Sequence, residues 1–245
     1  MINFTKWIDL YTELYEINPT QEKFFYSLCD EFPQHAKALN VEAGLALLPS
    51  KLAYKYDVTV TDSYPEFIRH IGTRQTNTEV QPPAFHIDSV DIARYLGKEF
   101  FNVIFCINSR LIFLKEKTLI EKLMFDAKSL LTDGGYIVFD IANFARYDFS
   151  QDQVVLPIRK AKGIELKSTI YKNKEQAFYK LDQQATLDNG KVIDVVKQER
   201  ICPISIESFK QIADRIGFSS VEFYSDYDKT PYTKDAMKLI CVFKK

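Results

Sequence analysis

Two apolar runs on either side of an amphipathic segment constrain the fold of this 245-residue chain more than any other feature. The runs are residues 101–107 (FNVIFCI) and 136–141 (YIVFDI), and residues 116–131 between them place apolar side chains at helical spacing. Apolar strands of this kind are typical of parallel sheets, which helices cover on both faces. The pattern therefore predicts a strand–helix–strand unit inside an open α/β sheet.

The same alternation of strands and helices extends from the start of the chain to residue 141. It predicts helices at 3–16, 20–32, 48–54, 65–71 and 116–131, and strands at 37–41, 57–61, 84–87, 101–107 and 136–141. Residue 18 is an Asn and residue 19 a Pro, a pairing that favours the start of the second helix.

After residue 150 the pattern changes to strands separated by turns. Strands are expected at 153–159, 164–172, 176–186 and 191–200, with turns at 172–174 and 188–190. The second turn contains Asn-Gly, a strong hairpin signal. A helix at 206–216, ended by Gly217, and strands at 221–224 and 237–243 complete the chain.

Charge and hydropathy exclude several functional classes. The chain has 32 Lys and Arg against 33 Asp and Glu, so it lacks the basic surplus of a nucleic-acid-binding or membrane-surface protein. No apolar stretch approaches the ~18 residues that a membrane helix needs, and the N-terminal segment lacks the uncharged core of a signal peptide. We therefore expect a cytoplasmic protein with neither nucleic acid nor membrane as a partner.

Cysteine and histidine give no metal or disulfide pattern. The four cysteines form no CxxC pair, and Cys106 and Cys241 lie in apolar runs, where cysteine acts as a small hydrophobe. The histidines, His35, His70 and His86, have no partner at ligand spacing. We expect reduced thiols and no metal site.

Glycine is scarce. The chain contains 8 glycines, whereas the usual ~7% would give roughly 17 in a chain of this length. Phosphate-cradling loops and tight nucleotide-binding turns are built from glycine, so the shortage bears on cofactor binding.

Three segments together resemble the class I S-adenosylmethionine-dependent methyltransferases of the small bacterial type. Residues 101–144 look like that family's fourth strand, the following helix, its L-x-x-G-G turn and a fifth strand ending in FDI. Residues 57–68 (DVTVTDSYPEFI) look like its second strand, and the tail from Gly217 resembles its closing strand pair.

This resemblance implies one domain, residues 1–245, with a doubly wound, mostly parallel, seven-stranded Rossmann-like sheet and an antiparallel β insertion. Its parts would be N-terminal helices (1–34), the Rossmann-like core (35–148), the insertion (149–203), and a C-terminal helix and strand pair (204–245). The implied activity is methyl transfer from S-adenosylmethionine to a small molecule, because the insertion matches a segment that covers the active site in relatives acting on sugars and other small molecules.

The resemblance also assigns the adenosine half of the cofactor site. Asp62 would accept both ribose hydroxyls at the end of the second strand. Asp91 would receive the adenine amino group, with Asp88 as the rival for that role. Ile92 would pack on the adenine face.

The methionine half is assigned in the same way. Ile107 and Asn108 would lie beneath the methionine moiety and beside the acceptor. Tyr11, in a segment (WIDLYTELYE) that resembles the family's N-terminal motif, is a candidate lid. No catalytic base is assigned; Tyr11, Asn108 and the insertion are only candidates.

The first loop departs from the family's glycine-rich LDLGCGTG motif. In the preferred alignment of residues 39–46 (LNVEAGLA), Gly44 remains, Glu42 and Ala46 replace the first and third glycines, and Asn40 replaces the acid. A second alignment makes Glu42 the acid but shortens the distance to Asp62 further. Glu42 could crowd the methionine carboxylate or bridge to the cofactor's ammonium group.

Two other functions remain open at this stage. A catalytically inactive relative with weak or no cofactor binding could act as an interaction or regulatory module. A dinucleotide-dependent oxidoreductase is disfavoured because the loop lacks GxGxxG. Strands of the insertion could form a homodimer contact or a substrate lid.

Overall fold

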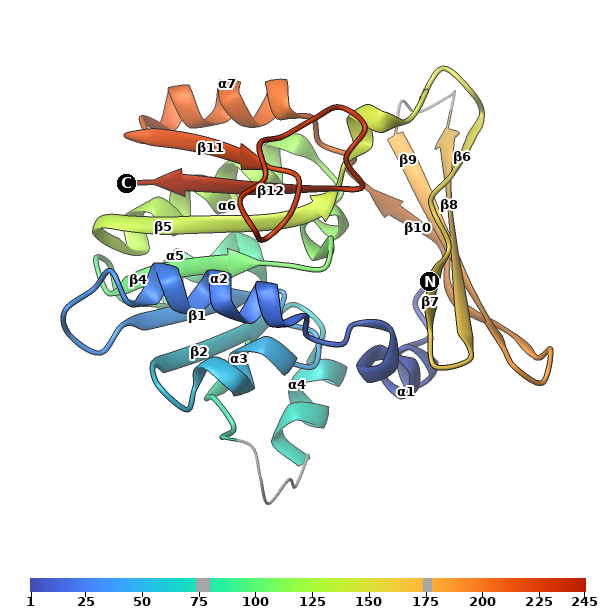
Figure 1. The fold of residues 1–245 in the computed structure, drawn as a ribbon, viewed down its shortest axis with the longest axis horizontal. Coiled ribbons are helices and arrows are strands. Elements are labelled where there is room, and N and C mark those ends of the chain that lie inside the picture. Colours follow the sequence, from blue (N-terminus) through green and yellow to red (C-terminus); the bar gives the residue numbers. More distant parts are fainter. Residues whose placement is uncertain (74–79, 174–177) are drawn as a thin grey trace.

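The main sheet of the protein has seven strands, as predicted. The computed structural model describes residues 1–73, 80–173 and 178–245 (Figure 1). The strands lie in the order β11-β12-β5-β4-β1-β2-β3. Their bounds are β1 Lys37–Val41, β2 Asp57–Asp62, β3 Ala84–His86, β4 Phe101–Cys106, β5 Leu131–Ala142, β11 Ser220–Tyr224 and β12 Lys238–Lys244. Strands β1 to β5 are parallel, and β12 runs antiparallel to both β5 and β11.

Helices cover both faces of this sheet. The helices of the described residues are α1 Phe4–Leu14, α2 Pro19–Cys29, α3 Leu47–Leu52, α4 Pro65–Thr73, α5 Ile92–Tyr95, α6 Lys117–Leu130 and α7 Ile206–Ile216. Of these, α1 lies beside the insertion rather than on a face of the main sheet. Short 3₁₀ turns lie at η1 Ser89–Asp91, η2 Arg110–Leu114 and η3 Phe144–Arg146. The Asn18 side chain caps α2, and Gly217 ends α7 in the left-handed conformation, as expected.

Alternation along β5 shows how the apolar runs create two cores. Ile137, Phe139 and Ile141 pack on the face covered by α6 and α7. Tyr136 and Val138 pack on the opposite face with α2 and α3. Successive side chains of a strand point to opposite faces, so a strand buried on both sides must be apolar at nearly every position.

The insertion forms a second, antiparallel sheet. It contains β6 Gln153–Val155, β7 Arg159–Ala161, β8 Ile164–Asn173, β9 Phe178–Leu187 and β10 Val192–Ile201. The order is β10-β9-β8-β6, and β7 also pairs with β8. Figure 1 shows that β4 and β5 point their carboxyl ends toward this sheet, with α1 near its lower end. The insertion therefore stands over the edge of the main sheet where ligands bind in such folds.

Several boundaries differ from the sequence predictions. The single strand expected at 153–159 is two strands, β6 and β7, because Pro157 lies between them and lacks the N–H that a continuous ladder needs. Strand β5 begins at Leu131, with a register shift against β4 that takes up the Gly134-Gly135 turn. The end of the predicted 172–174 turn and the first residues of the predicted 176–186 strand lie outside the described residues.

The described residues bear on three further expectations. No helix within residues 1–73, 80–173 and 178–245 is long and apolar enough to cross a membrane. The same residues contain no group of three His, Cys, Asp or Glu side chains that could hold a metal ion. All four cysteines are free thiols.

Candidate functional site

Three charged side chains meet where β1, β2 and β4 end. Glu42 directly follows β1, Asp62 is the last residue of β2, and Arg110 opens the η2 turn after β4. Arg110 Nη2 lies 3.1 Å from Glu42 Oε2, and 3.2 Å and 3.1 Å from Asp62 Oδ1 and Oδ2. The order of the strands places this triad, Glu42–Arg110–Asp62, at the switch point of the sheet.

The triad is almost completely removed from water. The exposed fractions are 4% for Glu42, 0% for Asp62 and 1% for Arg110. Burial, with Asp62 adding to it, raises the pKa of Glu42 to about 7. Burial opposes the charge on Arg110, but the carboxylates of Asp62 and Glu42 outweigh it and raise the pKa of Arg110 above its ordinary value.

Aromatic rings enclose the guanidinium group. Its central carbon lies 4.9–5.5 Å from the ring centroids of Trp7, Tyr64, Phe67 and Phe113. Cation–π attraction of this kind is strongest where water is excluded. Inside the cage, Arg110 Nη1 is buried and has no hydrogen-bond partner among the described residues.

The loop after β1 supports the triad from the other side. Gly44 N donates to Asp62 Oδ2 at 2.8 Å, and the Glu42 carboxylate accepts hydrogen bonds from Ser63 and Ser89. Gly44 has φ of +59°, and a Cβ there would lie 2.5 Å from the Tyr11 hydroxyl oxygen. A side chain at Gly44 would therefore collide with Tyr11, which covers this loop.

The predicted methionine-side residues lie together. Tyr11, Asn40, Ile107 and Asn108 line one small cavity of about 10 Å³. Asn40 is fully buried, and its Nδ2 donates to the Phe105 carbonyl at 2.9 Å. Burial raises the pKa of Tyr11, so its hydroxyl stays protonated.

The two acids considered for the adenine lie in different surroundings. Asp88 lines a cavity of about 260 Å³ together with Glu42, Ser63 and Tyr64, and its Oδ1 accepts from Val90 N at 3.1 Å. Asp91 is exposed and is not part of the lining of that cavity. Ile92 is buried in the core on the same side of the sheet as α6.

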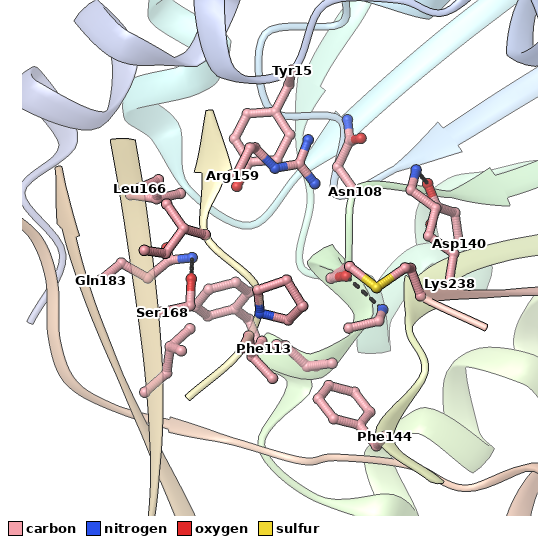
Figure 2. A pocket seen from close by; sticks show the side chains of 18 of the residues that line it. Tyr15, Asn108, Phe113, Asp140, Phe144, Arg159, Leu166, Ser168, Gln183 and Lys238 are labelled. Atoms are coloured by element: carbon pink, nitrogen blue, oxygen red, sulfur yellow. Dashed lines mark hydrogen bonds and ion pairs between the residues drawn. The ribbon is translucent and has the colours of Figure 1, made fainter. Parts of the chain in front are cut away.

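A larger pocket lies between the main sheet and the insertion. Its volume is about 320 Å³, and Asn108 belongs to both this pocket and the small cavity beside Asn40. Figure 2 shows Tyr15 and Arg159 at one side of it, Ser168 and Gln183 on the insertion, and Asp140 with Lys238 opposite. The pocket therefore takes its walls from both sheets.

The polar side chains that line this pocket differ in whether they have hydrogen-bond or ion-pair partners. Asp140 accepts from Lys238 at 3.3 Å and from Tyr227 at 2.8 Å. Within the described part of the chain Arg159 has no carboxylate within ion-pair distance; it donates to the Leu14 carbonyl and stacks on Tyr15. Gln183 Oε1 and Trp7 Nε1 are buried, and neither has a hydrogen-bond partner in the part of the chain that the structure describes. The charged lining is Asp140, Arg159 and Lys238, so one positive charge is left over.

Sequence reasoning missed Arg110, Asp140, Arg159 and Lys238 as site residues. Two of them left a signal: Arg110 interrupts the apolar stretch FCINSRLIFL and Asp140 interrupts YIVFDI. A charge inside such a run must be paired once the run is buried, so each marks a buried polar site. Arg159 and Lys238 lie in ordinary polar stretches and left no such signal.

Comparison with known proteins supports the fold. No family model matches the chain, and no curated protein matches it in sequence. Similar solved structures include the CcbJ methyltransferase from Streptomyces caelestis, with a TM-score of 0.75 at 14% identity, covering 97% of this chain and 95% of that one. An S-adenosylmethionine-dependent methyltransferase from Clostridium acetobutylicum has a TM-score of 0.71 at 14% identity, covering 98% of each chain.

A third similar structure is CalS10 from Micromonospora echinaspora, an amino pentose methyltransferase with S-adenosylmethionine bound. It has a TM-score of 0.66 at 11% identity, covering 97% of this chain and 96% of that one. These similarities extend over the core, the insertion and the closing strand pair alike. The chain therefore has the fold of the class I S-adenosylmethionine-dependent methyltransferases.

Proposed function

We propose that this protein is an S-adenosylmethionine-dependent methyltransferase that acts on a small-molecule acceptor. The observation that carries the proposal is the 320 Å³ pocket between the two sheets, which adjoins the strand ends where the resemblance assigns the cofactor. Solved structures that share the whole architecture include methyltransferases, one of them described as acting on an amino pentose.

The residue types at the strand ends are suitable for binding adenosine, except for Arg110. Asp62 supplies a carboxylate after β2, Tyr64 an aromatic ring beside it, and Asp88 an acid at the next strand's end. Arg110, however, already binds both Asp62 oxygens. The donor set therefore fits the cofactor only in a conformation in which Arg110 has left Asp62.

When bound, S-adenosylmethionine would supply an electrophilic methyl group for in-line displacement by an acceptor nucleophile. The chain's own residues would bind and orient that acceptor. Asn108 lines both the acceptor pocket and the methionine-side cavity. Asp140, buried and already paired with Lys238, would accept a proton or a hydrogen bond from a group placed beside Asn108.

The charges of the pocket favour an acceptor with an anionic group. Arg159 is the cation there that has no carboxylate partner within the described residues, and a guanidinium matches a carboxylate or phosphate in geometry. Gln183 Oε1 and Trp7 Nε1 add an unused acceptor and an unused donor for hydroxyl or amino groups. The proposed acceptor is therefore a polar, anionic small molecule.

The test is transfer of a labelled methyl group from S-adenosylmethionine to a panel of anionic and matched neutral acceptors. The proposal expects a product heavier by one methylene unit, formed with anionic members, and loss of that preference in Arg159→Gln. Lys160→Gln is the matched control, because Lys160 lies next in the sequence but outside the pocket lining and pairs with Glu165. Absence of cofactor binding in the wild type and in all Arg110 variants described below would favour the non-catalytic alternative.

A further inference from the structure

The Glu42–Arg110–Asp62 triad places a side chain where the proposed cofactor needs an empty carboxylate. Asp62 Oδ2 already accepts from Gly44 N and from Arg110, and Asp62 Oδ1 accepts from Tyr64 N and from Arg110. Two ribose hydroxyls would compete for these same oxygen atoms. The guanidinium and a vicinal diol therefore exclude one another at Asp62.

The aromatic rings around Arg110 also line two neighbouring cavities: Trp7 lines one, Tyr64 lines the other and Phe113 lines both. The cavity beside Asp88 has a volume of about 260 Å³, and the pocket beside Asn108 has a volume of about 320 Å³. Phe113 lines both, and its ring lies 5.5 Å from the guanidinium carbon. Movement of Arg110 and Phe113 would join the two spaces into one cleft at the carboxyl edge of β1, β2 and β4.

The backbone that carries Arg110 is held in an unfavourable conformation. Asn108 and Ser109, directly before it, have φ of +59° and +58°, and Lys115 after the η2 turn has φ of +70°. Left-handed backbone is unfavourable for residues other than glycine, and such strain is typical of segments that switch between states. A rearrangement of residues 108–115 would relieve part of it.

The hydrogen bonding of the guanidinium is incomplete as well. Arg110 Nη1 is buried and has no partner within residues 1–73, 80–173 and 178–245. An unsatisfied buried donor weakens the state that contains it. The present position of Arg110 thus combines strong ion pairs with an unsatisfied donor and a strained backbone. Such a balance suits a side chain that a ligand can displace.

We propose that Arg110 competes with adenosine-containing ligands for Asp62 and thereby sets the affinity of the protein for its cofactor. This inference rests on the proposed function. The cleft is closed by the protein's own cation in the absence of ligand, and it accepts a ribose diol when residues 108–115 move the guanidinium away from Asp62. Arg110 is thus a residue that controls binding rather than a catalytic residue.

The test compares affinities for S-adenosylhomocysteine by titration calorimetry. Arg110→Gln removes the competing cation, so it should bind at least about tenfold more tightly than the wild type, the change expected when a charge-assisted competitor is lost. Arg215→Gln is the matched control, because Arg215 forms a two-point ion pair with Glu121 on the surface and lies far from the triad in the fold. It should bind as the wild type does.

A second variant keeps the test decisive if Arg110→Gln does not fold. The double substitution Glu42→Gln with Arg110→Gln leaves one carboxylate at the position of the triad, Asp62, which still accepts from Gly44 N and Tyr64 N. Glu42→Gln alone is its reference. The double variant should bind S-adenosylhomocysteine more tightly than that reference.

Fluorescence supplies a readout that is independent of affinity. Trp7 is the only tryptophan of the chain, and its ring lies 5.0 Å from the guanidinium carbon. Saturation of the wild type with S-adenosylhomocysteine should shift the emission of Trp7 toward that of Arg110→Gln.

The outcomes separate this inference from the proposed function. Tighter binding by the Arg110 variants supports both. Equal or weaker binding by folded Arg110 variants, or unchanged Trp7 emission in a saturated wild type, overturns the competition while leaving the proposed function standing. If neither the wild type nor any Arg110 variant binds the ligand, the proposed function and this inference both fail.

Discussion

The two halves of the candidate site are built in opposite ways. The cofactor half is closed: the buried ion-pair triad lies inside a cage of aromatic rings, and the cavity at its methionine end is only about 10 Å³. The acceptor half is an open pocket of about 320 Å³ whose polar groups are only partly paired. In this structure the chain's own side chains therefore fill the strand ends of β1, β2 and β4, while the space between the two sheets stays open.

The largest expected difference between the two halves is the loss of unfolding free energy when the arginine of each half is replaced. Arg110→Gln leaves two buried carboxylates without their cation, so it should lower the free energy of unfolding by about 3–5 kcal/mol. Arg159→Gln removes an exposed guanidinium from the open half and should lower it by less than about 1 kcal/mol. Urea unfolding monitored through Trp7 measures both. Equal losses in the two variants would contradict the view that the buried ion pairs of Arg110 stabilise the fold more than the exposed Arg159 does.

A dependence on pH should follow from Glu42. Burial and the neighbouring Asp62 raise the pKa of Glu42 from 4.5 to about 7, against the attraction of Arg110 and the hydrogen bonds from Ser63 and Ser89. A carboxyl group with a raised pKa in the folded state contributes stability that is full below its unfolded pKa and is lost as the pH rises through the folded pKa.

The wild type should therefore lose stability relative to Glu42→Gln between pH 4.5 and about 7, by up to about 3 kcal/mol at 1.36 kcal/mol per pKa unit. Unfolding curves of the two proteins across this range test it. A constant difference across the range would show that Glu42 does not change its charge there.

The sequence predicted the fold better than the site, for a physical reason. Strand and helix patterns depend on which side chains are buried, and the apolar runs at 101–107 and 136–141 identify buried strands directly. The resemblance also assigned Asp62 to the ribose and placed Glu42 and Gly44 in the first loop of the cofactor site, and the structure brings these three residues together. It considered Glu42 as a partner for a ligand cation, whereas the cation that Glu42 meets is Arg110.

That pairing could not be read from the sequence because it joins residues 68 positions apart across the sheet. Local periodicity records which residues are buried together but not which polar groups pair. Arg159 and Lys238 are missed for the same reason, since the acceptor pocket exists only once the insertion stands over the strand ends. The parts of a site that come from tertiary contact need the structure.

Alanine substitutions at two glycines can distinguish the stability lost through backbone strain from the stability lost through collision with Tyr11. Gly44 and Gly190 both have positive φ, but a Cβ at Gly44 meets the Tyr11 ring and hydroxyl, whereas a Cβ at Gly190 meets nothing within 4 Å. Gly190→Ala should lower stability by about 1 kcal/mol through strain alone. Gly44→Ala should lower it by roughly 1–3 kcal/mol more because of the collision. Similar losses would mean that Tyr11 moves aside readily.

The smallest expected effect decides between the two acids considered for the adenine amino group. Asp88 caps the η1 turn through Val90 N and lines the cavity beside Glu42, so Asp88→Ala should lower stability by about 0.5–1 kcal/mol. Asp91→Ala, at an exposed position outside that cavity, should change it by less than about 0.5 kcal/mol.

The same pair should differ in binding when tested in the Arg110→Gln background, where Asp62 is free to bind a ribose. If Asp88 receives the adenine amino group, Asp88→Ala weakens adenosine binding and Asp91→Ala does not, as measured by titration calorimetry with adenosine. Weakening by Asp91→Ala alone would support the assignment of Asp91 that the family resemblance prefers. It would also mean that α5 moves toward the triad on binding, because Asp91 lies outside the cavity as the structure stands.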